Sequence, residues 1–581
     1  MDKTDNPMDH KPLLLGKIHH WESFFDPEVN MLKLPFHSPG YHTTLTAEEF
    51  PLVHPTYPSL LYALALLDSG LPDYTTRAYE VIRKVISLQD QNPKHLTYGI
   101  WSWFYEEPLT EMSPPDWNWA DFCGKQLVQI EVRHGDRLPM ELRELIRQAV
   151  FCACNAIMKR DVGPNYTNIA LMGALVTLIA GEAYAEPELA DYGIRRLEKL
   201  HAFTNQLGTF HEFNSPTYTV IAITELSKIY TMTASAQAKA FAEDLLDSAW
   251  RMVAEHFHPA TKQWSGPHSR SYSTLLSDMT KSFLQIATNE RVVFRFENEQ
   301  PYDAEWFGSG ICCPHKYYPF FTQSEERLLQ QLYSRNEQTG QEKWATTYMT
   351  PSFAIGVSSE EIMWNQTRPL LVFFDNGGEA AYLKLRVLHD GYDYCSAVLN
   401  SRVEGSRLLL GIRFLTDGGD THPSLDRING CIAVSDLRIR VELGGCLDNV
   451  DAEVSGERAE VRIGDCKVAL RILFTAFGAG TDEHDDKQKD NWKWELARNS
   501  SSFCFDHILH AVEDSTIDFE KMGKAAFLFS LVIGEAEPEI IVEAYDNAVA
   551  AIFASKQNAA ATIDDPIKLS LALKPAASPS A

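Results

Sequence analysis

The sequence lacks the paired cysteines that mark zinc ribbons and redox motifs. Its ten cysteines are scattered without a CxxC pair, and several lie in apolar runs such as FCACNA. A free thiol in such a run behaves as a small buried hydrophobe. We therefore expect the cysteines to be reduced.

Long apolar runs are also missing. No stretch reaches the length of about 20 apolar residues that spans a bilayer, and the first twenty residues lack the apolar core of a secretory signal. These absences predict a soluble, cytoplasmic protein with no membrane partner. A chain trimmed of its signal would have the same sequence.

Positive charge is scarce. The chain has 52 Lys and Arg against 79 Asp and Glu, which gives a formal net charge of -27. Proteins that bind nucleic acid gain affinity from clustered Lys and Arg, so nucleic acid is excluded as a partner. A polyanionic substrate would need a local basic cleft.

Helical periodicity is present from Tyr57 to about His258, where apolar residues recur at spacings of three and four. Short connections containing Gly, Pro or Asn separate the helical segments, so consecutive helices should be antiparallel. Such hairpins stack into an open solenoid or close into a toroid. No sequence repeat requires a solenoid, and we predict an (α/α) toroid.

The apolar period changes to two after about Asn289, and the alternating segments end in Gly, Asp or Asn turns. This pattern predicts a large antiparallel β-sandwich and an α+β multidomain fold. We expect an N-terminal extension (1–55), the toroid (56–289), an aromatic connector between domains (290–325), the sandwich with a closing helix (326–560) and a disordered tail (561–581).

The segment GTFHEFNSPTY, residues 208–218, concentrates proton-handling groups between two helical patterns. Gly208, Glu212, Ser215, Pro216 and Tyr218 follow a loop motif of the heparinase II/III and alginate lyase superfamily of polysaccharide lyases. The order of helical and sheet domains resembles that family over nearly the whole chain. Leu207 stands where the family often has an Asp.

The resemblance implies a lyase that cleaves uronate-containing oligosaccharides by β-elimination. Such a reaction needs donors that neutralise the sugar carboxylate, and groups that remove the neighbouring proton and protonate the leaving oxygen. The resemblance implies Tyr218 for proton transfer and Asn165 or Asn168 for neutralisation. His211 is a further candidate for either role, and Glu212 is expected to orient a neighbour.

Each of these residues also has a structural interpretation. Asn165 is of a type that caps helices, and a tyrosine that begins an apolar helix, as Tyr218 does, usually packs in the core. Ser215 and Pro216 are typical of a helix start.

A second cluster follows the last long helical pattern, in WSGPHSRSY. His268, Arg270 and Tyr272 lie there in a Gly and Pro turn, and a guanidinium suits a substrate carboxylate. The alternative is an ordinary surface turn.

Aromatic residues are dense between Tyr98 and Phe122. Flat rings with nearby polar groups are typical of a carbohydrate cleft, whereas the alternative is that the rings fill the helix layers. The candidates for sugar binding are Trp101, Trp103, Tyr105, Trp117, Asn118 and Trp119.

Relatives in the family often hold a structural zinc, and His389 and His422 lie beside Asp390 and Asp420. Their spacing is no metal signature, so solvated turns are the alternative. The elimination itself requires no cofactor.

Three other functions remain open. A glycoside hydrolase would use two carboxylates flanking the bond, taken from Glu106, Glu107, Asp116 and Glu212. A dehydratase, isomerase or cyclase could use the same Tyr, His and Asn residues on a small metabolite. A glycan-binding protein without catalysis is the fourth reading. The sequence leaves the glycan and the oligomeric state open.

Overall fold

The computed structural model describes residues 9–38, 41–478, 492–534, 536–554 and 567–578. The chain forms two compact units, which we call the helical unit and the sheet unit. The helical unit takes Met1–Gln206, Tyr218–Arg251 and Asp278–Lys316, and the sheet unit takes Leu207–Thr217, Met252–Ser277 and Tyr317–Ala581. The expected domain boundaries therefore differ, because two short segments before residue 289 pack with the sheets.

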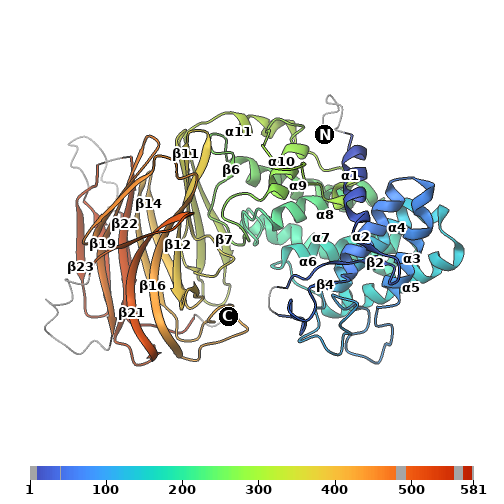
Figure 1. Ribbon diagram of the computed structural model, residues 1–581, viewed down its shortest axis with the longest axis horizontal. Coiled ribbons are helices and arrows are strands. Elements are labelled where there is room, and N and C mark those ends of the chain that lie inside the picture. The colour runs from blue at the N-terminus through green and yellow to red at the C-terminus, as the bar shows by residue number, and fades with distance from the viewer. Residues whose placement is uncertain (1–8, 39–40, 479–491, 535, 555–566, 579–581) are drawn as a thin grey trace. The chain divides into compact units, whose positions relative to one another are not determined.

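The helical unit consists of consecutive helices, with short connections from α4 to α9 and longer ones before α2, before α4 and before α10, and the predicted α+β class is confirmed (Figure 1). The helices, of which α7 and α9 end in the sheet unit, are α1 (Lys11–Glu22), α2 (Thr56–Asp68), α3 (Thr75–Ile86), α4 (Trp119–His134), α5 (Met140–Arg160), α6 (Thr167–Ala183), α7 (Pro187–Leu207), α8 (Tyr218–Met232), α9 (Ala236–His256) and α10 (Asp278–Ala287).

Four of these helices form an inner row in the order α2, α4, α6 and α8. α6 is buried on nearly every residue because its sequence is apolar on all sides, whereas the outer helices α3 and α7 bury one stripe. Between two inner helices that follow each other in the row, an outer helix reverses the chain. The inner helices therefore run parallel.

Side-chain contacts confirm this direction. Trp119 Nε1 donates to Thr56 Oγ1 over 2.9 Å and joins the starts of α4 and α2, while Arg133 binds Asp68 at their ends. Glu182, near the end of α6, accepts from the hydroxyl of Thr233, just after α8. The N-termini of the inner helices consequently gather at one edge, which we call the helix rim.

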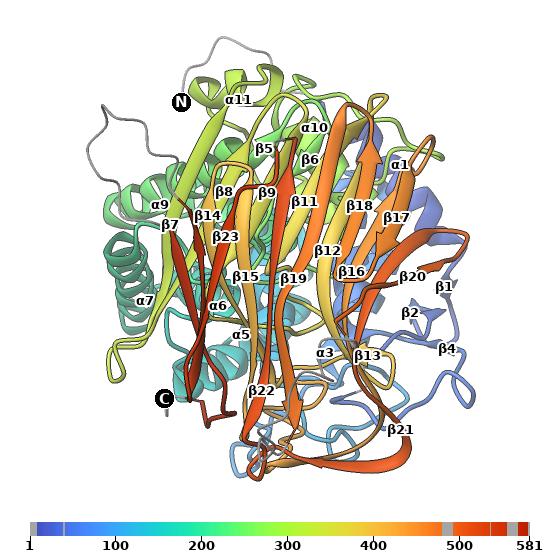
Figure 2. The same cartoon turned by 90° about the vertical axis from the view of Figure 1, so that its left-hand side faces the viewer.

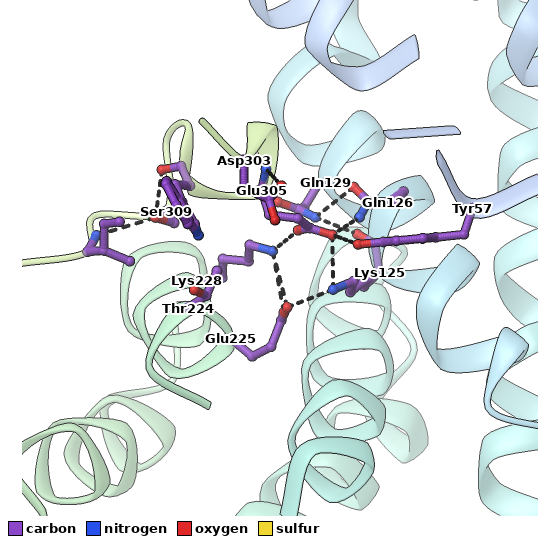
Figure 3. A network of polar contacts seen from close by, with 12 residues as sticks. Tyr57, Lys125, Gln126, Gln129, Thr224, Glu225, Lys228, Asp303, Glu305 and Ser309 are labelled. Atoms are coloured by element: carbon purple, nitrogen blue, oxygen red, sulfur yellow. Dashed lines mark hydrogen bonds and ion pairs between the residues drawn. The ribbon is translucent and has the colours of Figure 1, made fainter. Parts of the chain in front are cut away.

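A buried polar network connects the inner row (Figure 3). Glu305, in the 3₁₀ turn Ala304–Trp306, contacts Tyr57 of α2, Lys125 of α4 and Lys228 of α8. Because one carboxylate reaches three of the four inner helices, the row must curve around it. This curvature agrees with the predicted toroid, and Glu305 of the aromatic connector takes part in the network.

The sheet unit contains two large antiparallel sheets (Figures 1 and 2). The nine-stranded sheet has the order β20-β21-β16-β12-β11-β9-β8-β7, with β13 beside β12. Its strands are β7 (Arg327–Arg335), β8 (Glu342–Met349), β9 (Phe353–Ser358), β11 (Leu370–Asn376), β12 (Glu379–His389), β13 (Tyr392–Asp393), β16 (Cys431–Gly445), β20 (Glu495–Arg498) and β21 (Ser502–Asp518).

The second large sheet has seven strands in the order β10-β14-β15-β22-β19-β18-β17. Alternation along its strands supplies two faces: Leu408 and Leu410 of β15 join the main sandwich core, whereas Leu409 joins a second, smaller core. The strands are β10 (Glu361–Ile362), β14 (Ala397–Glu404), β15 (Arg407–Phe414), β17 (Asp451–Ser455), β18 (Arg458–Ile463), β19 (Cys466–Gly478) and β22 (Lys524–Ile533).

A three-stranded sheet forms a third layer and corrects two predictions. β23 (Ile540–Ala544), β24 (Ala548–Phe553) and β25 (Lys568–Ala572) cover the outer face of the seven-stranded sheet. The predicted closing helix is therefore wrong, because alternate residues of the apolar run in β24 join the small core that also contains Leu409. The predicted disordered tail is wrong for residues 567–578; its other residues lie outside the described part of the chain.

The remaining elements are short. They are the pairs β1 (Phe25–Asp26) with β2 (Met31–Leu32), β3 (Leu34–Pro35) with β4 (Leu52–Val53) and β5 (Phe257–His258) with β6 (Gln263–Trp264), and the helix α11 (Tyr318–Thr322). Within the described residues, no helix combines the length and the apolar character needed to cross a membrane.

Candidate functional site

Two loops of the sheet unit interlock through one buried asparagine. α7 ends at Leu207, and Gly208 follows with the left-handed φ of 78° that commonly terminates a helix. Asn214 further along this loop is fully buried, and its Nδ2 donates to the carbonyls of Ser265 and Pro267 over 2.8 and 2.9 Å. The segment 207–217 thereby orders the segment 264–272.

The second loop lies directly on the nine-stranded sheet. A Cβ atom on Gly356 of β9 would lie 1.9 Å from the carbonyl carbon of Gly266, so only glycine permits this approach. Thr347 Oγ1 donates to the carbonyl of Gly266 over 2.7 Å. His268 and Arg368 then exchange two backbone hydrogen bonds of 3.2 and 2.9 Å, which places the loop beside residues 364–369.

This packing assembles a polar group that we call the Arg270 cluster. Arg270 Nη2 donates to Gln366 Oε1 over 2.8 Å, and Arg270 Nη1 lies 3.4 Å from Glu212 Oε1. Its guanidinium carbon lies 5.5 Å from the centre of the Trp364 ring, and Tyr272 OH is 3.5 Å from Nη2. The structure thus brings together three predicted residues, Glu212, Arg270 and Tyr272.

The metal candidates have other partners. The His422 ring packs edge-on against Trp364 at 5.5 Å, and its Nδ1 accepts from the backbone N–H of Ser424. Burial lowers the pKa of His422; Asp426 opposes this shift and the Arg270 charge adds to it. Both ring nitrogens of His389 are hydrogen-bonded, to Asp420 and to a carbonyl. Among the described residues, no group of three or more His, Cys, Asp or Glu side chains is arranged to hold a metal ion.

His268 is a positioning residue in this structure. Its ring is buried and Nδ1 donates to the carbonyl of Asn214 over 2.5 Å. Burial lowers the pKa of His268 to about 3, so the ring is neutral at neutral pH. His211 is half-buried, with Nε2 3.3 Å from Ser334 Oγ of β7.

The helix rim carries the other predicted catalytic residues. Tyr218 is the first residue of α8 and is half-buried, so its ring is not sealed in the interior. Asn168 is buried in the first turn of α6, and Asn165 is exposed in the preceding turn. Because α6 and α8 are parallel neighbours, Tyr218 and Asn168 lie at the same end of the helical unit. The positive ends of the helix dipoles gather there as well.

The aromatic segment divides between core and rim. Trp101 is fully buried and donates to the carbonyl of Val85, so it is a core residue. The ring of Trp103 packs at a tilt against that of Trp119, with the ring centres 5.0 Å apart, and belongs to a small apolar cluster. Tyr105 is 42% exposed and lies under the ammonium of Lys84.

Three of the predicted sugar-binding residues lie at the rim, at the start of α4. Trp117, Asn118 and Trp119 are all half-buried. Asn118 Nδ2 lies 3.4 Å from the hydroxyl of Tyr166, which precedes α6, and its Oδ1 accepts from Arg160. Asn118 therefore connects the starts of two neighbouring inner helices.

The carboxylates considered for a hydrolase have structural partners. Glu106 binds the ring and backbone of His54, and Glu107 accepts from the hydroxyls of Thr43 and Thr44. Asp116 accepts from Trp103 Nε1 over 3.2 Å. These three carboxylates are thus hydrogen-bonded to neighbouring residues and stabilise the local structure.

Sequence reasoning missed Asn214, Trp364 and Gln366. Asn214 precedes a Ser-Pro pair and has a left-handed φ of 49°, a conformation that asparagine tolerates better than most residues. This local signal existed in the sequence. Trp364 and Gln366 join the cluster only through the loop packing on the sheet, and no local pattern marks them.

The comparisons with known proteins concern a family model, curated proteins and solved structures. Residues 22–298 match the model of a family described as a domain of unknown function, DUF8769. The comparison with curated proteins gives no match.

Similar solved structures include three lyases. Heparinase III is 11% identical with a TM-score of 0.44, covering 89% of this chain and 82% of its own. Chondroitin AC lyase of Streptomyces coelicolor A3, in complex with chondroitin sulphate, is 10% identical with a TM-score of 0.45, covering 95% and 86%. Xanthan lyase of Paenibacillus is 10% identical with a TM-score of 0.42, covering 93% and 59%. At these values the similarities assign neither an activity nor a substrate to this chain.

Proposed function

We propose that this protein is a lyase that cleaves uronate-containing glycans by β-elimination. The observation that carries the proposal is the Arg270 cluster. The Arg270 side chain is 22% exposed, and its guanidinium is oriented by Gln366 and Glu212 and lies over the ring of Trp364. An arginine fork suits a carboxylate and an indole suits the apolar face of a sugar, so together they recognise an acidic sugar.

The chemistry requires the sugar carboxylate to be neutralised before the adjacent carbon loses its proton. The C–H electrons then form a double bond, the C–O bond to the leaving sugar breaks, and the leaving oxygen takes up a proton. In this proposal the Arg270 cluster serves only to bind an acidic sugar of the glycan, and the reaction itself is assigned to residues of the helical unit. Tyr218 transfers protons through its phenol, and Asn168 with the helix N-termini of the rim stabilises negative charge that develops in the reaction.

Tyr218→Phe tests the proposal, because it removes only a hydroxyl. Cleavage of uronate oligosaccharides is measured by the ultraviolet absorbance of the conjugated product, which hydrolysis does not form. We expect the variant to lose about 10²- to 10⁴-fold in turnover, the usual contribution of a general acid or base, with its melting temperature nearly unchanged.

Tyr192→Phe is the matched control. It removes a half-buried tyrosine hydroxyl from α7, where the hydroxyl donates to Asp161 over 2.7 Å, and it should retain full turnover. Product absorbance that persists in Tyr218→Phe, or sugar release without absorbance in the native enzyme, would contradict the proposal.

A further inference from the structure

A small cavity in the sheet unit is lined by an unusual set of cations. Its volume is about 90 Å³. Arg368, Lys384 and Arg386 line it together with Asp393 and Trp364. The chain as a whole has a net charge of -27, whereas three cationic side chains line this one small cavity.

The strand register explains why these cations lie together. Lys384 and Arg386 are two residues apart on β12, so they share the face of the nine-stranded sheet that points away from the sandwich core, while Leu385 between them is in the core. Glu442, directly opposite Lys384 on β16, binds Lys384 over 3.1 Å and Arg386 over 3.2 Å. Asp393 binds Arg386 through both carboxylate oxygens.

Asp393 and Glu442 bind Lys384 and Arg386, and Arg368 is left without a carboxylate partner among the described residues. Arg368 Nη1 donates to the carbonyls of Asn365 and Thr367, and its buried Nε has no hydrogen-bond partner among the described residues. Burial lowers the pKa of Lys384, and the Arg386 charge adds to this shift against the opposing effect of Glu442. Three cations therefore face two carboxylates, and a buried donor is left unused.

We propose that this cavity binds a small oxyanion group, a carboxylate or a sulfate, carried by the glycan. Its volume of about 90 Å³ equals that of about three water molecules, which suits one such group rather than a sugar ring. Trp364 belongs both to this cavity and to the Arg270 cluster, so the two anion sites adjoin. The inference rests on the proposed function and narrows its substrate to glycans with a second acidic group near the first.

The test measures binding rather than turnover, so it stays separate from the lyase assay. Inorganic sulfate and glucuronate are titrated by calorimetry into the full-length protein, at ionic strength matched with chloride. The variants are Arg368→Gln and Lys384→Gln, each accepted only if its melting temperature without ligand stays near that of the native protein. Arg402→Gln, which removes an exposed guanidinium from β14, is the matched control.

We expect both anions to bind the native protein and Arg402→Gln alike, and to bind at least tenfold more weakly to either cavity variant. Absence of binding to the native protein, or equal binding to the cavity variants, overturns the proposal. If sulfate binds and glucuronate does not, the cavity does not bind a sugar carboxylate. If sulfated monosaccharides also fail to bind, the anion that the cavity binds is not carried by a glycan, and the proposal is overturned. A protein inactive as a lyase that still binds both anions at this cavity would contradict the proposed function alone.

Discussion

At the scale of single residues, two histidines of the sheet unit are buried as neutral rings. His256 donates from Nδ1 to the carbonyl of Met252 over 2.8 Å, and burial lowers its pKa to about 4. The pKa of His268 is lowered further, to about 3, also by burial. Both rings help to order the loops that assemble the Arg270 cluster.

These histidines predict a loss of stability in mild acid. Their folded pKa values lie below the unfolded value of about 6.5, so from there down toward pH 4 the unfolded chain takes up protons that the folded chain does not. The contribution of the two neutral rings to the free energy of unfolding is complete above about pH 6.5 and decreases as the pH is lowered below that value. We expect His256→Gln to reduce the slope of unfolding free energy against pH by up to about 1.4 kcal/mol per pH unit in this window.

Urea unfolding at several pH values measures this slope. An identical slope in His256→Gln and the native protein would show that the buried ring does not govern acid sensitivity.

At the scale of elements, β25 turns a segment expected to be disordered into part of a core. Leu569, Leu571 and Leu573 are buried, and Leu571 packs against Gly411 of β15. Buried and exposed residues alternate along β25, because one side of this strand faces the seven-stranded sheet and the other side faces solvent.

Leu571→Ala should destabilise the sheet unit by about 2–5 kcal/mol, the usual cost of truncating a buried leucine. Lys568→Ala, at an exposed position of the same strand, should change stability by less than about 0.5 kcal/mol. Urea unfolding measures both. Equal stabilities would mean that residues 567–578 contribute nothing to the fold.

At the scale of the whole molecule, the helical unit depends on charges buried where its inner helices meet. Lys125 Nζ lies 2.8 Å from Glu225 and 3.0 Å from Glu305, and Lys228 binds Glu305 as well (Figure 3). Burial raises the pKa of Glu305, but the charges of Lys125 and Lys228 overcome this effect and hold it below its ordinary value. The carboxylate is therefore ionised at neutral pH.

Removing that carboxylate leaves two buried ammonium groups with one partner, Glu225. We expect Glu305→Ala to destabilise the helical unit by about 3–5 kcal/mol, as when one member of a buried ion pair is lost. Glu198→Ala, at an exposed position of α7, should be nearly neutral. Thermal unfolding followed by circular dichroism compares them, and a loss below about 1 kcal/mol for Glu305→Ala would contradict the role of this network.

The sequence by itself determined the two classes of structure and most of the chemical groups. The change of apolar period near Asn289 separates helices from strands, because that period reflects which side of each element faces a core. The crowded loop before Tyr218 and the turn containing Arg270 were also evident as local concentrations of polar residues.

Only the tertiary structure decided which core each segment joins. The loops 207–217 and 252–277 pack with sheets that follow them in the sequence, and Trp364 and Gln366 reach Arg270 through that packing. Trp101 is buried while Trp117 is half-buried, although both belong to one aromatic run. Periodicity reports local burial alone, whereas these positions depend on contacts between residues far apart in the chain.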